Sequence, residues 1–191
     1  MKVSIIVAAT SNTHAIGRKG DLPWKLKEEM QYFRDLTSTT SDENKTNCVI
    51  MGRKTYESIP AKFRPLPNRL NIILSKNASI REVLKIPENV LIADSLESAL
   101  NLLEPTSSTY DQVFIIGGGS VYREAMRSIR CSKIYLTEVN IDIPDADTFF
   151  PDIPEDKYQI TYRSPMKIED GISYYFTEYD SIPQPLPHNN P

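Results

Sequence analysis

One carboxylate on an otherwise apolar helix face is the residue best placed to do chemistry in this sequence. Residues 25–36 place apolar side chains at helical spacing, and at about 100° per residue these side chains fall within one arc. They are Leu26, Met30, Phe33 and Leu36. Glu29 is the only charged residue inside that arc, so we expect burial to raise its pKa. A ligand with two parallel N–H donors would match the two carboxylate oxygens. The alternative is that Glu29 reaches solvent at the edge of the face or caps a neighbouring backbone group.

Three turns at the ends of apolar runs carry residues suited to phosphate. They are Met51-Gly52-Arg53-Lys54-Thr55, Leu74-Ser75-Lys76 and Gly117-Gly118-Gly119-Ser120-Val121-Tyr122. Cations, hydroxyls and helix-start N–H groups bind phosphate oxygens, and consecutive glycines let the backbone approach a pyrophosphate closely. Because parallel strands end at one edge of a sheet, the three turns together indicate a dinucleotide that carries an extra phosphate. Each turn alone could be an ordinary solvated turn, since the sequence has neither G-x-G-x-x-G nor a P-loop.

The loop 15–24 joins the first apolar run to the helix of Glu29. Gly17 and Gly20 could act as hinges, and Leu22 and Trp24 are large enough to cover a site. One interpretation is a lid that excludes water from the reaction. The other is an ordinary loop that ends at a packed tryptophan.

The elements that must position these residues follow an α/β order. Short apolar runs, continuous rather than alternating, are typical of parallel strands covered by helices on both faces. They span 3–9, 48–51, 70–74, 90–93, 113–116 and 134–139. A helix is expected after Asp94, with Asp94 as N-cap, Glu97 completing a capping box and an apolar face that includes Leu96 and Leu103. Two antiparallel strands, 158–163 and 172–179, are expected around a turn at 169–171. We therefore expect a single domain with a central, mostly parallel twisted sheet, an antiparallel C-terminal edge and helices on both faces.

Composition narrows the function classes. The chain has 191 residues, 40% of them hydrophobic and 25% charged, enough for one folded core without disulfide or metal. A net charge of −3 argues against general nucleic-acid binding. The two cysteines, Cys48 and Cys131, are expected to be buried free thiols, and no cluster has metal-ligand spacing. The first apolar run is too short to span a membrane, which favours a soluble cytoplasmic protein.

The motifs together resemble the dihydrofolate reductase family. They agree with it in order and spacing: Leu22-Pro23-Trp24, Glu29 with Phe33, Met51 to Thr55, Arg69 before 70–75, Gly117 to Tyr122, Tyr135-Leu136-Thr137 and Asp147 to Pro151. The match runs from about residue 3 to 179, which implies a reductase domain over 1–180 and a proline-rich tail over 181–191. The long segment between Thr37 and Asn47 is similar to that of the eukaryotic enzymes, and we expect the monofunctional type.

The resemblance implies the chemistry and the folate site. The family transfers a hydride from NADPH to C6 of dihydrofolate, with protonation at N5, and is the target of antifolates. Glu29 would bind the pterin 2-amino group and N3–H, Thr137 would bond to its carboxylate, and Trp24 would hold a water; Leu22 completes this catalytic group. Arg69 would bind the glutamate α-carboxylate. The substrate site as a whole would comprise Val7, Ala8, Glu29, Met30, Phe33, Ile59, Phe63, Leu66, Arg69 and Ile116.

The resemblance also implies the cofactor site. The pyrophosphate would lie on the glycine turn, and Arg53, Ser75 and Lys76 would surround the 2′-phosphate, which favours NADPH over NADH. Many relatives carry arginine where this chain has Lys76, so the charge is kept and the fork geometry is lost. The full set is Ala9, Ile16, Gly17, Gly52, Arg53, Lys54, Thr55, Leu74, Ser75, Lys76, Gly117, Gly118, Gly119, Ser120, Val121 and Tyr122.

Two other functions stay open at this point. A reductase that acts on a riboflavin precursor would share the NADPH features, but Glu29 and Arg69 favour folate. A catalytically silent nucleotide-binding protein would keep the glycine turn and lack turnover. We expect a monomer without a nucleic-acid or membrane partner.

Overall fold

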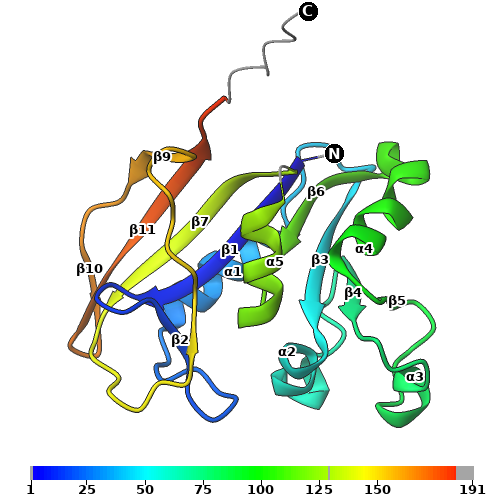
Figure 1. The fold of residues 1–191 in the computed structure, drawn as a ribbon, viewed down its shortest axis with the longest axis horizontal. Helices are drawn as coiled ribbons and strands as arrows, with labels where there is room; N and C mark the ends of the chain where they lie inside the picture. The colour runs from blue at the N-terminus through cyan, green and yellow to red at the C-terminus, as the bar shows by residue number, and fades with distance from the viewer. Residues whose placement is uncertain (1, 129, 184–191) are drawn as a thin grey trace, which may run out of the picture.

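Continuous runs of valine, isoleucine and leucine form the central strands of one twisted sheet, because helices cover both of its faces (Figure 1). The computed structural model describes residues 2–128 and 130–183. Its strands are β1 (Lys2–Thr10), β2 (Ala15–Gly17), β3 (Thr46–Gly52), β4 (Arg69–Leu74), β5 (Leu91–Ala93), β6 (Tyr110–Ile115), β7 (Cys131–Asn140), β8 (Thr148–Phe149), β9 (Tyr158–Arg163), β10 (Lys167–Glu169) and β11 (Ile172–Ser181). Its helices are α1 (Lys27–Ser38), α2 (Arg53–Ser58), α3 (Ile80–Val83), α4 (Leu96–Leu103) and α5 (Gly119–Arg127), with 3-10 turns at Ala61–Phe63 and Glu104–Thr109.

The order of the strands places the antiparallel part at one edge. Along the sheet the order is β10-β11-β7-β1-β6-β3-β4-β5, and β9 also pairs with β11. All neighbours from β7 to β5 are parallel, whereas β11 runs antiparallel to β7, and β9 and β10 run antiparallel to β11. The expectation of a mostly parallel sheet with an antiparallel C-terminal edge is therefore confirmed.

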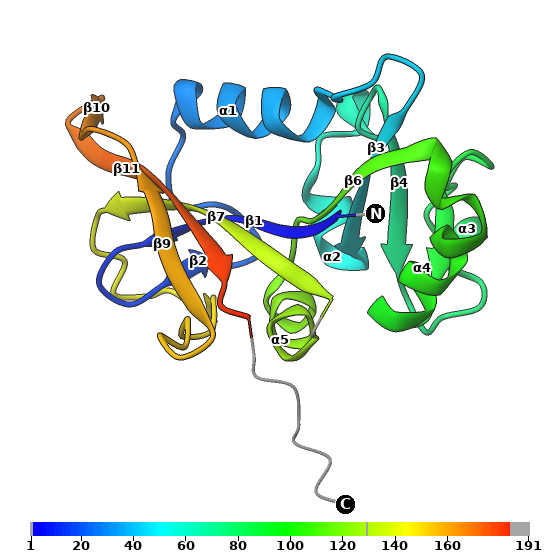
Figure 2. The ribbon, with the colours of Figure 1, turned by 90° about the horizontal axis from the view of Figure 1, so that it is seen from above.

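Side chains of β1 alternate between two cores on opposite faces of the sheet. Ile5 and Val7 pack with α4 and α5 on one face. Ile6 packs on the other face with Phe33 and Leu36 of α1. Figure 2 shows α1 and α5 on opposite sides of the sheet, which confirms the prediction of helices on both faces. Within the described residues, no helix is long and apolar enough to cross a membrane.

The connections change direction between β1 and β6. The chain leaves β1 through α1 toward β3 on one side, and leaves β6 through α5 toward β7 on the other. Neighbouring parallel strands with diverging connections leave a crevice outside their carboxyl ends, where α/β proteins bind ligands. We therefore expect a ligand site at the carboxyl ends of β1 and β6.

The structure corrects several boundaries. The first helix covers Lys27–Ser38 rather than 25–36. Ser95, not Asp94, is the N-cap of α4, and the Ser98 side chain, not that of Glu97, completes the capping box; the Asp94 carboxylate instead accepts from both serine hydroxyls. The turn at 169–171 joins β10 to β11, so a third strand separates β9 from that turn. Of the expected proline-rich tail, 184–191 lie outside the described residues.

Candidate active site

Glu29 lies on the face of α1 that packs on the sheet. Tyr32 and Phe33 are half-buried on that face, and Glu29 falls between these two residues on the helix wheel, with the buried Thr37 beyond Phe33. The Glu29 side chain is half-buried, and it forms no hydrogen bond or ion pair with any residue that the structure describes. Burial raises its pKa from an ordinary value of 4.5 to about 7. Among the described residues Glu29 thus caps no backbone group, and its side chain is only partly accessible to solvent.

Thr137 and Trp24 lie on the face of the sheet that α1 covers. Thr137 is 2% exposed on β7, and the strand register sets it beside Ala8 of β1 and Phe176 of β11. Phe176 stacks on Tyr32 of α1 with ring centroids 4.0 Å apart, so Thr137 shares the face that α1 covers. The expected hydrogen bond from Thr137 to Glu29 is not formed in this structure. Trp24 is 5% exposed, and its Nε1 is a buried donor without a partner among the described residues.

The expected apolar lining residues divide into three groups. Phe33, Ile59, Leu66 and Ile116 are half-buried around one cluster on the α1 face of the sheet. Met30 and Phe63 are exposed, at 60% and 54%, so the buried arc of α1 is rotated away from Met30 and toward Tyr32. The side chains of Val7 and Ala9 point into the core on the opposite face of the sheet. These two residues would therefore contact a ligand beside Glu29 through their backbone, and their place in the site stays a prediction.

Arg69 is held at the far end of α1 from Glu29. Its Nε donates to the Pro67 carbonyl at 2.8 Å, and its Nη1 donates to Thr37 Oγ1 at 2.8 Å. Burial and the neighbouring Arg34 guanidinium both lower the pKa of Arg69. No carboxylate pairs with Arg69 among the described residues, so its remaining N–H groups are suited to bind an anion. Glu29 and Arg69 thus lie at opposite ends of one helix face, one acidic and one basic.

The glycine turn after β6 meets the end of β3. The Gly52 N–H donates to the Gly117 carbonyl at 2.7 Å, and the Ile116 N–H donates to the Ile50 carbonyl at 2.9 Å. This pairing brings together the starts of α2 and α5. Gly118 is the N-cap of α5 and provides no side-chain acceptor, so the first N–H groups of the nine-residue α5 remain available to an anion. The turn can therefore receive an anion, and its role in binding a pyrophosphate stays a prediction.

Gly117 is required by its surroundings. It has φ +107°, and a Cβ at this position would lie 2.9 Å from Cε2 of Tyr122. Tyr122 was expected among the cofactor-binding residues, but its side chain lies in the core. Its hydroxyl donates to the Ile6 carbonyl at 2.8 Å, and its ring packs edge-on against Phe150. Burial, and to a smaller extent the negative charge of Glu29, raise the pKa of Tyr122.

The two basic turns lie side by side. Gly52 is paired with Leu74 in the sheet, so Arg53 and Ser75 follow neighbouring positions at one edge. Acidic groups accompany the cations here. Arg53 Nη1 lies 3.5 Å from the Glu57 carboxylate. Hydrogen bonds from Ser98 and Ser95 lower the pKa of Asp94, and the Lys76 charge adds a smaller contribution. Lys54 is exposed, and Thr55 is half-buried beside Gly118.

The loop between β1 and α1 is anchored to a distant segment. Gly17, expected as a hinge, is buried in β2, which pairs with β8, and Ile16 is half-buried next to it. Arg18 and Asp21 close a tight turn with two backbone hydrogen bonds, and the Lys19 N–H donates to Asp147 Oδ2 at 2.7 Å. Trp24 is packed, while Leu22 is 49% exposed. Gly17 is therefore held in a paired strand, and Gly20 lies in the turn closed by Arg18 and Asp21.

An open hollow of about 490 Å³ lies near the amino ends of β1, β6 and β7. It is lined by Lys2, Ser4, Gln112, Ser132, Lys133, Tyr135, Asp180 and Ser181. The Lys133 ammonium pairs with Glu178 at 2.7 Å and Asp180 at 3.3 Å, so its charge is already neutralised. The hollow therefore offers no chemistry comparable to that around Glu29.

Sequence reasoning missed the residues that hold the start of α1. Glu169 of β10 accepts hydrogen bonds from the N–H groups of Lys27 and Glu28 at 2.7 and 3.1 Å. Lys167 and Tyr174 bond to the Glu28 carboxylate. These contacts join residues about 140 positions apart, and no local pattern in the sequence could indicate them.

Comparisons with known proteins show the family of this chain. A sequence model of the family described as dihydrofolate reductase matches residues 2–181. The dihydrofolate reductase of Aedes albopictus is 41% identical over 189 residues, covering 96% of this chain and 99% of that protein. That of Heliothis virescens is 41% identical over 187 residues, covering 95% and 98%. The bifunctional dihydrofolate reductase-thymidylate synthase of Daucus carota is 46% identical over 177 residues, 92% of this chain, which spans about a third (33%) of that protein. The chain belongs to the dihydrofolate reductase family.

Proposed function

We propose that this chain catalyses the NADPH-dependent reduction of 7,8-dihydrofolate to 5,6,7,8-tetrahydrofolate, which supplies one-carbon metabolism and thymidylate synthesis. The observation that carries the proposal is the half-buried Glu29 carboxylate, which has no partner among the described residues and has a pKa of about 7. It lies on the α1 face of the sheet, and its negative charge helps to raise the pKa of Tyr122, whose ring lies next to Gly117. A charged group kept in this state needs a ligand with matching donors, and the pterin ring offers a 2-amino group and N3–H.

Three side chains act on the pterin. The Glu29 carboxylate accepts both N–H groups and orients the ring, and Thr137 donates to the same carboxylate once a ligand draws the groups together. The unpaired Trp24 Nε1 holds a water near the pterin O4, because a buried indole donor gains a partner in this way. Water delivers the proton to N5, and the negative charge of Glu29 favours the positive charge that develops on the ring. Arg69 binds the α-carboxylate of the glutamate tail and sets the direction of the substrate.

NADPH supplies the hydride when it is bound, and the residues present fit it. The uncapped start of α5 receives the pyrophosphate through backbone N–H groups, with Lys54 and Thr55 nearby. Arg53, Ser75 and Lys76 recognise the 2′-phosphate, and NADH would offer these residues no phosphate to bind. Ile16 and Ile116 flank the nicotinamide.

We place the reductase domain at 1–180, and we expect a cytoplasmic monomer that binds antifolates as well as dihydrofolate. The cleft is lined by Met30, Phe33, Ile59, Phe63 and Leu66. Leu22, exposed on the anchored loop, covers the reacting rings and excludes water.

The decisive experiment follows the absorbance of reduced nicotinamide in the presence of the purified chain. Dihydrofolate with NADPH should give turnover, NADH should give much less, and a riboflavin-precursor pyrimidine should give none. E29Q is the control, because it keeps the shape of the side chain and removes the charge. Turnover only with the riboflavin precursor, or binding of NADPH without turnover on either substrate, would refute the proposal.

A further inference from the structure

The helix that carries Glu29 begins without a cap of its own. Leu26 occupies the N-cap position of α1 with extended backbone angles, and its side chain has no acceptor. The first turn of a helix leaves N–H groups that need partners from outside. Here the partner is the carboxylate of Glu169, which accepts from the N–H of Lys27 through Oε1 at 2.7 Å and from the N–H of Glu28 through Oε2 at 3.1 Å.

A second set of contacts joins the same turn to the same hairpin. The Glu28 carboxylate accepts from the Lys167 ammonium and, at 3.1 Å, from the Tyr174 hydroxyl. Lys167 and Tyr174 are cross-strand partners in the β10–β11 hairpin, which closes through Asp170 and Gly171 at positive φ. Tyr174 is fully buried, so the hairpin gives the start of α1 a rigid support.

Glu29 follows directly after the two residues whose N–H groups are held. In an α-helix the backbone of the first turn fixes where the next side chain leaves the helix. We propose that Glu169 is a positioning residue for the reduction of dihydrofolate: by holding the first two N–H groups of α1, it sets the position of the Glu29 carboxylate over the sheet. The inference rests on the proposed function of Glu29.

The contact suits a carboxylate and no other side chain of this size. Two oxygens receive two N–H groups, and a negative charge is favourable at the start of a helix. In E169Q one oxygen would remain and an NH₂ group would face the second N–H, so one bond is lost. In E169A both are lost. The two variants should therefore form a graded series.

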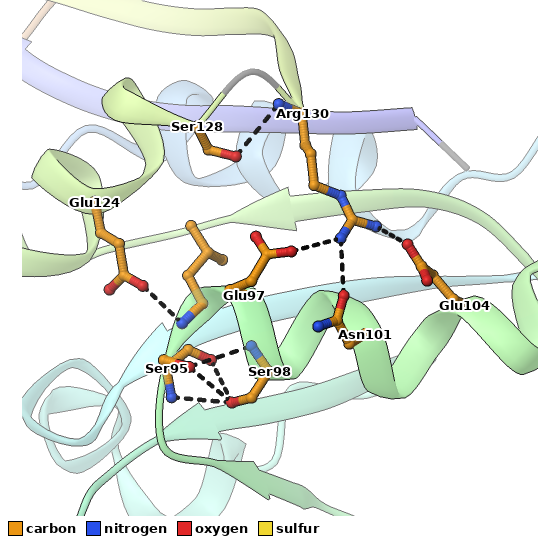
Figure 3. Close-up of polar contacts among 9 residues, drawn as sticks. Ser95, Glu97, Ser98, Asn101, Glu104, Glu124, Ser128 and Arg130 are labelled. Atoms are coloured by element: carbon orange, nitrogen blue, oxygen red, sulfur yellow. Dashed lines mark hydrogen bonds and ion pairs between the residues drawn. The ribbon is translucent and has the colours of Figure 1, made fainter.

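The chain contains a matched control at another helix. Glu124 of α5 accepts from the Leu96 N–H at the start of α4 at 3.0 Å, which is the same type of contact across the fold (Figure 3). Figure 3 also shows Arg130 joined to Glu97, Asn101 and Glu104 of this region. The α4 helix carries none of the site residues, so E124A removes a helix-start bond without touching Glu29.

The test compares the full-length wild type, E169Q, E169A and E124A at a temperature where circular dichroism shows all of them folded. Steady-state kinetics give kcat and KM for dihydrofolate, and quenching of protein fluorescence gives the Kd for NADPH. We expect kcat/KM for dihydrofolate to fall roughly tenfold to a hundredfold in E169A, the scale for misplacing a reacting group by about 1 Å. E169Q should lie between E169A and wild type, and the Kd for NADPH should not change. E124A should have a lower melting temperature with unchanged kinetics.

Two results would overturn the inference. If E169A melts earlier but keeps wild-type kcat/KM while folded, Glu169 only stabilises the helix. If dihydrofolate and NADPH are weakened equally, the damage is general rather than directed at Glu29. Should E169A fail to fold, E169Q decides the same question. An inactive wild type, by contrast, would refute the proposed function itself.

Discussion

Replacing Glu29 with glutamine should stabilise the protein at alkaline pH while it lowers kcat/KM for dihydrofolate. The pKa of Glu29 is raised from 4.5 to about 7 by burial alone, so the folded protein binds this proton more tightly than the unfolded chain. Between these two values the unfolded state holds fewer protons than the native state. Stability therefore falls as pH rises through this window, and the loss is complete above pH 7.

The size of the effect follows from the two pKa values. A shift of one pKa unit corresponds to about 1.4 kcal/mol, so ionising Glu29 lowers the unfolding free energy by about 3 kcal/mol at pH 8 and by about 1 kcal/mol at pH 5. The effect on the unfolding free energy therefore differs by about 2 to 2.5 kcal/mol between pH 5 and pH 8. This difference comes from the charge, because the shape of the side chain is unchanged in E29Q. In a chain of this length it corresponds to a shift in Tm of roughly 4–10 °C.

Urea unfolding of wild type and E29Q at pH 5 and pH 8, without ligand, measures this difference. We expect the unfolding free energy of E29Q, relative to that of wild type, to be higher at pH 8 than at pH 5. In the same preparations E29Q should lose about 3 kcal/mol of transition-state binding, roughly a hundredfold in kcat/KM for dihydrofolate. An equal difference between wild type and E29Q at both pH values would show that Glu29 is not held in a buried, unpaired state.

Three further substitutions test other parts of the site. R69L should weaken dihydrofolate binding by about 2–3 kcal/mol and leave the Kd for NADPH unchanged, since the substrate carboxylate loses its cationic partner. The opposite pattern would reverse the assignment of the two ends of the cleft. G117A should destabilise the fold by about 2–3 kcal/mol and weaken NADPH binding, because its Cβ meets the Tyr122 ring at 2.9 Å and its φ is +107°; unchanged affinity would remove the glycine turn from the cofactor site. S95A should cost about 1 kcal/mol in urea unfolding with normal kinetics, as expected for the loss of an N-cap.

The central strands could be predicted because both of their faces are buried. A run such as Cys48 to Met51 is fully apolar in the sequence and fully buried in the sheet. The two-stranded pairing of β2 with β8 could not be predicted, since each strand has two or three residues and its stability comes from pairing with a distant segment. At the start of α4 the sequence offers Asp94 and Ser95, both good N-caps. The choice between them depends on which residue first leaves the helical backbone angles.

Glu29 could be found from the sequence because its signal is local. A helix wheel compares residues within three turns, and the single charge among apolar neighbours stands out in that window. Its rotation was harder to predict: the wheel suggests Met30 for the buried arc, whereas packing of Tyr32 on Phe176 turns the helix so that Met30 is 60% exposed. This contact depends on a strand near the C-terminus, outside the reach of any local pattern.

Three carboxylates meet at the start of α1, and only one of them is left for a ligand. The Glu169 carboxylate accepts hydrogen bonds from two backbone N–H groups. The hydrogen bond from Lys167 lowers the pKa of Glu28. Glu29 receives no such donor among the described residues, and burial raises its pKa to about 7. Adjacent glutamates thus acquire opposite pKa shifts because one side of the helix faces the hairpin and the other faces the sheet. The β10–β11 hairpin supplies donors to Glu28 and receives the first N–H groups of α1 on Glu169, whereas Glu29 has no such contact and stays available for a ligand.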